Sequence, residues 1–139
     1  GMGHAISIAT AIKIKKPDKR VICIDGDGAN LMHMGAMVAA ANTPGNLIHI
    51  LINNFSHESV GGQETMAKYI DYKLLSKSVG YKYYYLCENK KDIVNALSSN
   101  KENIFIEIRT NKICRSDLGR PKESPLVNKN NFMKKISDY

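Results

Sequence analysis

The chain has 139 residues and a mass of 15.5 kDa, about the size of one ordinary domain, so we expect a single domain over residues 1–139. Hydrophobic residues make up 43% and charged residues 24%, a composition that excludes a disordered chain. No apolar run approaches the roughly 20 residues of a membrane-spanning helix. The first basic residues follow the first apolar stretch, the reverse of a signal peptide. The sequence therefore predicts no membrane segment and no signal peptide.

A net charge of +7 fits three kinds of partner: nucleic acid, an anionic membrane surface or anionic small ligands. The basic residues are spread along the chain without an Arg-rich block, so we expect no nucleic-acid partner. The three cysteines, Cys23, Cys87 and Cys114, are odd in number and far apart, which argues against a disulfide framework or a zinc site. This cysteine usage favours a reducing, cytoplasmic location.

The predicted elements alternate between helices and short apolar strands. Helices are expected at 3–16, 30–42, 66–79, 90–98 and 129–136, and strands at 21–24, 47–52, 82–86 and 104–109. The segment from about 114 to 127 contains Gly119, Pro121 and Pro125 and is expected to be an irregular tail. Alternation of this kind predicts a three-layer α/β fold, with a mostly parallel sheet and helices on both faces.

Two polar segments follow two neighbouring predicted strands. Gly26-Asp27-Gly28-Ala29-Asn30 comes directly after one strand, and Asn53-Asn54 comes after the next. In a parallel sheet both segments lie at the carboxyl edge, where ligands bind. A Gly-Asp-Gly turn leaves backbone amides open to an anion, but its aspartate would repel that anion unless a divalent cation lay between them. The Asp27 carboxylate, the Asn54 amide oxygen and the Ser56 carbonyl would suit Mg²⁺.

A lone Gly-Asp-Gly is most often only a tight turn. It is also not a dinucleotide fingerprint here, because Leu31 stands where the third glycine is needed. The Asn-Asn pair is equally weak by itself. The two segments together, at the ends of adjacent predicted strands, form a much more specific signal.

Gly-Asp-Gly followed after about 25 residues by Asn-Asn resembles the diphosphate–magnesium motif of thiamine diphosphate enzymes. Further segments resemble the phosphonopyruvate decarboxylase family: Gly1–Ala5, Asn53–Gln63, Asp117–Pro121, Asn128-Lys129 and Phe132-Met133. The resemblance covers nearly the whole chain. It implies the C-terminal, diphosphate-binding domain of a thiamine diphosphate enzyme.

The resemblance implies a role for each matching residue. Asp27 and Asn54 would be side-chain magnesium ligands, and Ser56 would be a carbonyl ligand. The cofactor would also contact Met2, which props it into a bent form, and the turn residues Gly26, Gly28 and Ala29.

Three groups of residues are candidates for contact with the substrate. His57 and Ser59 match a loop that approaches cofactor and substrate, and His4 and His57 are candidate proton donors. Arg120 is a candidate for binding the substrate phosphonate, since a guanidinium suits such a group. The tail charge is otherwise interpreted as surface charge.

The implied activity is the thiamine diphosphate- and Mg²⁺-dependent decarboxylation of phosphonopyruvate to phosphonoacetaldehyde and CO2, a step of phosphonate biosynthesis. Members of the superfamily take an activating glutamate from a pyrimidine-binding domain, which this chain lacks. Glu58 and Glu64 are interpreted as solvated loop carboxylates. We therefore expect a pyrimidine-binding partner, either a second polypeptide or a missing domain, and a homo-oligomer.

Two alternatives remain open. One is a sulfopyruvate decarboxylase β subunit, or another thiamine diphosphate-dependent 2-oxoacid decarboxylase. The other is a non-catalytic module that binds an anion or a nucleotide. Outside the motif, we interpret His33, His49 and Cys23 as structural residues.

Overall fold

The computed structural model describes residues 1–113, 117–119 and 121–137. Four parallel strands form one sheet in the order β1-β2-β4-β3. The strands are β1 (Val21–Gly26), β2 (Leu47–Asn53), β4 (Ile104–Arg109) and β3 (Tyr83–Cys87). Each expected strand is present, because each is a short apolar run that the flanking helices can bury. The described part of the chain contains no helix that is long and apolar enough to cross a membrane.

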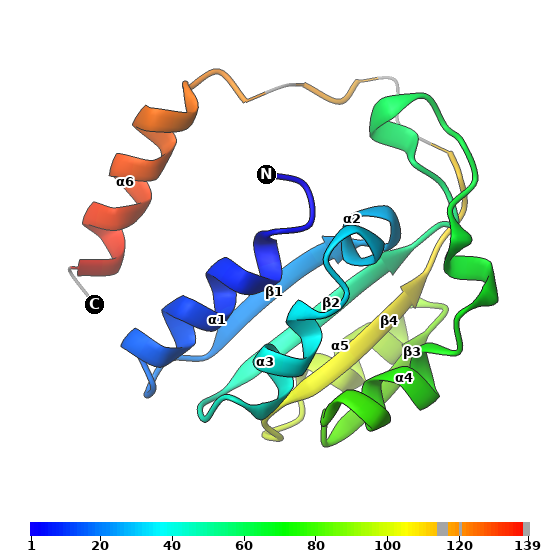
Figure 1. Cartoon of the computed structure of the whole chain (residues 1–139), viewed down its shortest axis with the longest axis horizontal. Coiled ribbons are helices and arrows are strands. Elements are labelled where there is room, and N and C mark those ends of the chain that lie inside the picture. Colours follow the sequence, from blue (N-terminus) through cyan, green and yellow to red (C-terminus); the bar gives the residue numbers. More distant parts are fainter. Residues whose placement is uncertain (114–116, 120, 138–139) are drawn as a thin grey trace.

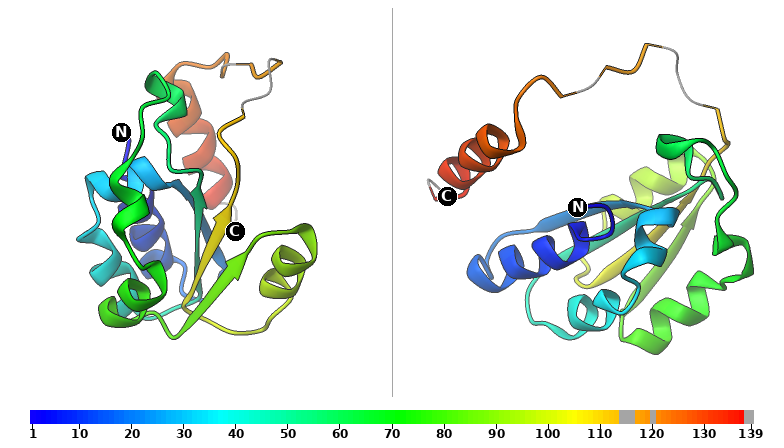
Figure 2. Two further views of the ribbon diagram at one scale, coloured as in Figure 1. Left: turned by 90° about the vertical axis from the view of Figure 1, so that its right-hand side faces the viewer. Right: turned by 45° about the horizontal axis from the view of Figure 1, so that its top comes forward.

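Helices cover both faces of the sheet, which confirms the α/β architecture predicted from the sequence (Figure 1). One face carries α1 (Ala5–Lys15), α2 (Asp27–Met32), α3 (Ala36–Asn42) and α4 (Tyr72–Val79), and the other carries α5 (Lys90–Leu97) (Figure 2). The connections β1–β2 and β2–β3 run across the sheet in one direction, whereas β3–β4 runs back. Right-handed crossovers therefore place α5 on the face opposite to the other helices.

The core has a separate part on each side of the sheet. On the multi-helix side, Phe105 packs with Tyr72 and Tyr81, and Ile6 and Ala9 of α1 pack on β1. On the α5 side, Ala96 packs on isoleucines of the central strands. The two central strands, β2 and β4, are buried on both faces, so they hold the loops at their carboxyl ends in place.

Two expected helices are each divided in two. The predicted helix 30–42 consists of α2, which already begins at Asp27, and α3, with a turn at 33–35 between them. Gly3, at φ +86°, packs against this turn, because a Cβ on Gly3 would lie 2.7 Å from Cδ2 of His33. The N-terminal loop thus packs closely against the end of α2 and the turn that follows it.

The predicted helix 66–79 is a 3₁₀ turn, η2 (Met66–Tyr69), followed by α4. Ile70 is extended, and the Asp71 side chain accepts a hydrogen bond from the Leu74 amide at 3.0 Å, so a new helix begins there. Gly80 ends α4 in the left-handed conformation, with φ 112°.

The last helix, α6 (Pro125–Ser137), begins four residues earlier than expected, with proline at its first position. It lies beside α1 and contributes no buried residue (Figure 1). Ile22 and Ile24 of the edge strand β1 are 51% and 65% exposed, and they line a hollow together with Phe132 of α6.

Candidate functional site

The Gly-Asp-Gly turn lies where β1 ends and α2 begins. Asp27 is only 2% exposed although it is a carboxylate. Its Oδ2 accepts a 2.5 Å hydrogen bond from the hydroxyl of Thr65, and no hydrogen bond from the part of the chain that the structure describes reaches Oδ1. A Cβ on Gly26 would meet no atom within 4 Å, so the backbone at this position faces open space. The turn thus presents bare backbone and one carboxylate oxygen.

The Asn-Asn pair ends β2, and its two members have different surroundings. Asn53 is fully buried, and its amide donates a 2.8 Å hydrogen bond to Oε1 of Glu107. The Asn54 side chain turns back along its own loop, where Oδ1 accepts a 3.0 Å hydrogen bond from the Ser56 amide. Asn53 anchors the strand end, and Asn54 and Ser56 form a tight turn beyond it.

Phe55, within this turn, has φ +58°, a left-handed conformation that is costly for a bulky side chain. Its ring packs against the multi-helix core and lies 5.4 Å from the guanidinium of Arg109. These contacts keep the strained residue in place. The sequence gives no signal for this conformation.

Glu107 of β4 forms hydrogen bonds with residues on three strands. Oε2 accepts a 2.6 Å hydrogen bond from the Tyr84 hydroxyl, and Oε1 accepts one of 2.9 Å from Nε of Arg109. This bond to Glu107 is the main cause that raises the pKa of Arg109, and burial raises the pKa of Tyr84. The buried carboxylate is therefore fully satisfied, as its burial requires, and it holds Asn53 in register.

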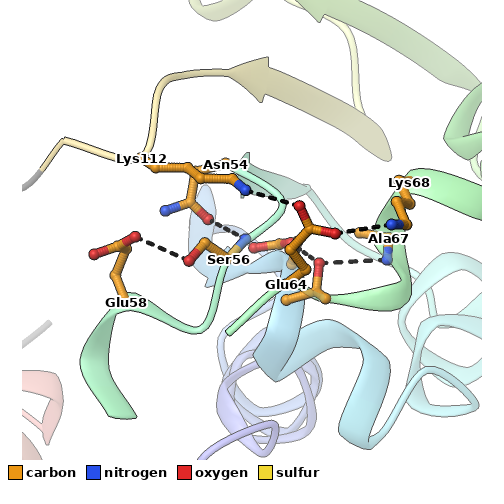
Figure 3. A network of polar contacts seen from close by, with 9 residues as sticks. Asn54, Ser56, Glu58, Glu64, Ala67, Lys68 and Lys112 are labelled. Atoms are coloured by element: carbon orange, nitrogen blue, oxygen red, sulfur yellow. Dashed lines mark hydrogen bonds and ion pairs between the residues drawn. The ribbon is translucent and has the colours of Figure 1, made fainter. Parts of the chain in front are cut away.

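The loop after Ser56 folds back as a short hairpin. Ser56 and Glu64 form an antiparallel bridge, and the Thr65 amide donates to the Phe55 carbonyl at 3.1 Å. The Ser56 hydroxyl donates to Glu58 at 2.9 Å (Figure 3). The loop thus leaves the sheet after Asn53 and closes on itself, with Thr65 beside Phe55.

Glu64 closes the base of this hairpin on the surface. Lys68 and Lys112 contact its two oxygens at 2.8 and 3.2 Å (Figure 3). These two hydrogen bonds lower the pKa of the Glu64 carboxyl. Glu64 is exposed, as expected, whereas Glu58 is half-buried beside the turn.

A cavity of about 200 Å³ brings both polar segments together. It is lined by residues from the N-terminal loop, the Gly-Asp-Gly turn, the end of β2 and the hairpin: Met2, Gly26, Asp27, Gly28, Ala29, Ile52, Asn54, Ser56, His57, Glu58 and Ser59. All the residues that we expected to contact the cofactor lie in it. Two lining residues, Ile52 and Glu58, were not expected there.

Two candidates lie elsewhere. His4 does not line this cavity; its ring packs against that of His33 with 4.1 Å between centroids. Arg120 lies outside the described residues. Thr65 was not singled out from the sequence, although a threonine just before a helical turn is a common capping signal.

The donors at this site match a hard cation. Asp27, Asn54 and Ser56, which carry carboxylate, amide and carbonyl oxygens, line one cavity, and the sulfur among its lining residues is the Met2 thioether, a soft ligand that does not suit a hard cation. Mg²⁺ takes one or two carboxylates together with phosphate oxygens and water. The donor set therefore fits Mg²⁺ and a diphosphate at this place.

A second polar cluster lies in the core. The ligand atoms of Cys23, Asp25 and His49 are within 4.8 Å of one another, and all three residues are buried. Burial and the nearby Asp25 raise the pKa of the Cys23 thiol to about 12, so this sulfur keeps its proton and is a poor metal ligand. His49 Nδ1 lies 2.9 Å from the Tyr81 hydroxyl. Cys23 and His49 are buried in the core, as expected, whereas Asp25 lies within β1 and not in the polar segment that follows it.

Residues 1–108 match the family described as "Thiamine pyrophosphate enzyme, C-terminal TPP binding domain". The chain belongs to this family. A similar fold occurs in the thiamine diphosphate-dependent 4-hydroxybenzoylformate decarboxylase of Rhodococcus jostii RHA1, with a TM-score of 0.64 and 21% identity. The match covers 79% of this chain and 23% of that one. Thiamine pyrophosphate and thiamine diphosphate are the same compound.

This chain covers different shares of the length of two curated relatives. Phosphonopyruvate decarboxylase of Streptomyces hygroscopicus is 32% identical over 89% of this chain, which spans 32% of that protein. Sulfopyruvate decarboxylase subunit β of Methanocaldococcus jannaschii is 34% identical over 97% of this chain and 73% of its own length. The chain thus spans about a third of the first relative and most of the second.

Proposed function

We propose that this chain is the diphosphate-binding part of a thiamine diphosphate- and Mg²⁺-dependent decarboxylase that converts phosphonopyruvate to phosphonoacetaldehyde and CO2. One observation carries the proposal: Asp27, Asn54 and Ser56 line one cavity at the carboxyl edge of the sheet, in a chain whose family is named for thiamine pyrophosphate. The named relatives support decarboxylation as the reaction.

In this proposal Asp27 and Asn54 hold Mg²⁺ through side-chain oxygens, and Ser56 holds it through its carbonyl. The backbone of Gly26, Gly28 and Ala29 contacts the diphosphate, and Met2 supports the cofactor from the N-terminal loop. When bound, thiamine diphosphate supplies the electron sink that allows a 2-oxoacid to lose CO2.

The other polar residues would act on the substrate side. His57 and Ser59 line the same cavity, and His57 Nδ1 is buried without a partner among the described residues. We propose that His57 holds the proton that is donated to the reacting carbon, with His4 as the alternative donor. Arg120 is proposed to bind the phosphonate, and the +7 charge favours an anionic 2-oxoacid.

A partner completes the proposed site. The cavity of about 200 Å³ is smaller than the 300–1,000 Å³ typical of sites for a whole cofactor. We propose that a pyrimidine-binding polypeptide or domain supplies the rest, including an activating glutamate, and that the assembly is a homo-oligomer. Since both cysteines within the described ranges, Cys23 and Cys87, are free, we place it in a reducing, cytoplasmic compartment.

The sulfopyruvate alternative has its own support. The matched relative is named as a subunit, and this chain spans 73% of its length. Its substrate carries a sulfonate in place of a phosphonate, so the same cationic residues could serve either acid. A non-catalytic anion-binding module is the remaining candidate and predicts binding without turnover.

The test has two steps. Calorimetry with thiamine diphosphate, with and without Mg²⁺ and in the presence of the pyrimidine-binding polypeptide, should show binding that requires the metal. The assembled protein is then assayed side by side with phosphonopyruvate, sulfopyruvate and pyruvate. Absence of Mg²⁺-dependent binding would reject the proposal. Turnover of sulfopyruvate alone would select the first alternative, and binding without any turnover would select the module.

A further inference from the structure

Thr65 connects the Gly-Asp-Gly turn to the loop that follows β2. Its hydroxyl donates a 2.5 Å hydrogen bond to Oδ2 of Asp27, across 38 residues of sequence. Thr65 is 1% exposed and Asp27 is 2% exposed, so water does not compete for this bond. A charge-assisted hydrogen bond in such surroundings is stronger than one between neutral groups.

A second hydrogen bond fixes the direction of the first. The Ala67 amide donates to Oγ1 of Thr65 at 3.3 Å, which caps the 3₁₀ turn η2. Because this amide uses an oxygen lone pair, the hydroxyl proton is left to point at the carboxylate. One oxygen of Asp27 is thus engaged inside the protein, and Oδ1 is the oxygen left for the cavity.

The hairpin positions Thr65 for this contact. Its amide donates to the Phe55 carbonyl at 3.1 Å, so Thr65 lies beside the turn that carries Asn54 and Ser56. Any shift of that turn relative to the Gly-Asp-Gly turn would stretch the bond to Asp27. Thr65 therefore ties the oxygens of the two turns to each other.

We propose that Thr65 is a positioning residue that makes Asp27 a one-oxygen metal ligand and thereby favours Mg²⁺ over Ca²⁺. This inference rests on the proposed metal site. Mg²⁺ needs six oxygens in a near-octahedral shell, whereas Ca²⁺ accepts six to eight and often takes both oxygens of a carboxylate. Engaging Oδ2 leaves Asp27 able to offer one oxygen, the arrangement that suits the smaller ion.

The test compares Thr65→Val, which keeps the shape but loses the hydroxyl, with Thr65→Ser, which keeps the hydroxyl. Thiamine diphosphate binding is titrated by calorimetry against Mg²⁺ and, separately, against Ca²⁺, with the pyrimidine-binding polypeptide present. We expect Thr65→Val to weaken Mg²⁺-dependent binding by about tenfold and Ca²⁺-dependent binding much less. Thr65→Ser should keep the wild-type preference.

The ratio of the two affinities is internal to each variant, so partial misfolding does not change it. Thr65→Ala provides a second variant without the hydroxyl if Thr65→Val is unstable. An unchanged ratio in the valine and alanine variants overturns the inference while leaving the proposed function intact. Absence of metal-dependent binding in the wild type overturns the proposed function itself, and the inference with it.

Discussion

The imidazole of His57 lies directly on the backbone of Gly28. A Cβ built on Gly28 would be 2.5 Å from Cε1 of this ring, far closer than carbon atoms approach in proteins. The contact joins the hairpin that follows β2 to the turn that follows β1. It forms one wall of the cavity, and glycine is the residue that permits it.

Replacing Gly28 with alanine should therefore displace His57 and narrow the cavity. We expect Gly28→Ala to weaken Mg²⁺-dependent binding of thiamine diphosphate by at least about tenfold, which corresponds to about 1.4 kcal/mol. The fold should survive, because the side chain that has to move is partly exposed. Calorimetry measures the affinity, and far-ultraviolet circular dichroism measures the fold.

Gly35→Ala provides the matched control. Gly35 has φ −59°, and a Cβ there would meet no atom within 4 Å. This substitution should leave binding unchanged and stabilise the chain by about 0.4–1 kcal/mol. If Gly28→Ala bound the cofactor as well as Gly35→Ala does, the contact between Gly28 and His57 would have no functional role.

Asp27→Ala should abolish Mg²⁺-dependent cofactor binding and preserve the fold. Diphosphate and metal would lose their shared anchor, whereas the surrounding strands would keep their packing. Asp18→Ala, an exposed acidic residue in the turn after α1, controls for the loss of one negative charge. Wild-type affinity in Asp27→Ala would contradict the assignment of Asp27 as a metal ligand.

Because Phe55 has a left-handed conformation, we expect glycine at this position to give a more stable chain than alanine, the reverse of the usual order. Phe55→Ala and Phe55→Gly both lose the ring and its packing, so their comparison isolates the Cβ. In the left-handed region we expect glycine to be more stable than alanine by about 0.5–1 kcal/mol, since relief of strain outweighs the entropy of the unfolded chain.

Ala39 of α3 provides the opposite case, because it is exposed on a regular helix. There glycine should be less stable than alanine by about 1 kcal/mol. Urea unfolding of Phe55→Ala, Phe55→Gly, Ala39→Gly and the wild type measures both differences in stability. The same sign at both positions would show that Phe55 is not held in the left-handed conformation in solution.

Cys23 predicts a loss of stability at alkaline pH. Burial raises the pKa of its thiol from 9.0 to about 12 in the folded chain. Between these values the folded chain holds a proton that the unfolded chain has lost, so the free energy of unfolding falls as pH rises from 9 to 12. Tyr81, whose pKa burial also raises, contributes in the same direction.

Cys23→Ala isolates the contribution of the thiol. Its unfolding free energy, measured in urea from pH 8 to 11, should fall less steeply with pH than that of the wild type. The thiol should also resist alkylation by iodoacetamide at pH 8.5 in the folded chain, tested in a variant in which Cys114 is replaced by serine. Equal slopes in wild type and Cys23→Ala would show that the thiol is not buried as described.

The sequence was sufficient to predict the strands and to predict that the two polar segments lie close together. Short apolar runs such as Leu47–Asn53 are recognisable because a strand buried on both faces needs apolar residues at nearly every position. The carboxyl ends of adjacent parallel strands lie at the same edge of a sheet, so the sequence alone predicts that Asp27 and Asn54 are neighbours.

Contacts that depend on a folded loop were not predictable. The hydrogen bond between Thr65 and Asp27 spans 38 residues and requires the hairpin to close on itself. The contact of the N-terminal loop at Gly3 with His33, in the turn between α2 and α3, joins segments 30 residues apart. Neither contact leaves a periodic pattern, since both arise from packing between distant segments.

The edge strand β1 has a consequence for handling the chain in the laboratory. Ile22 and Ile24 belong to a strand whose outer edge pairs with no other strand from the part of the chain that the structure describes. An apolar, unpaired edge is a template for another extended chain. Concentrated preparations of these 139 residues alone should therefore self-associate, and charged substitutions such as Ile24→Lys should keep them monodisperse.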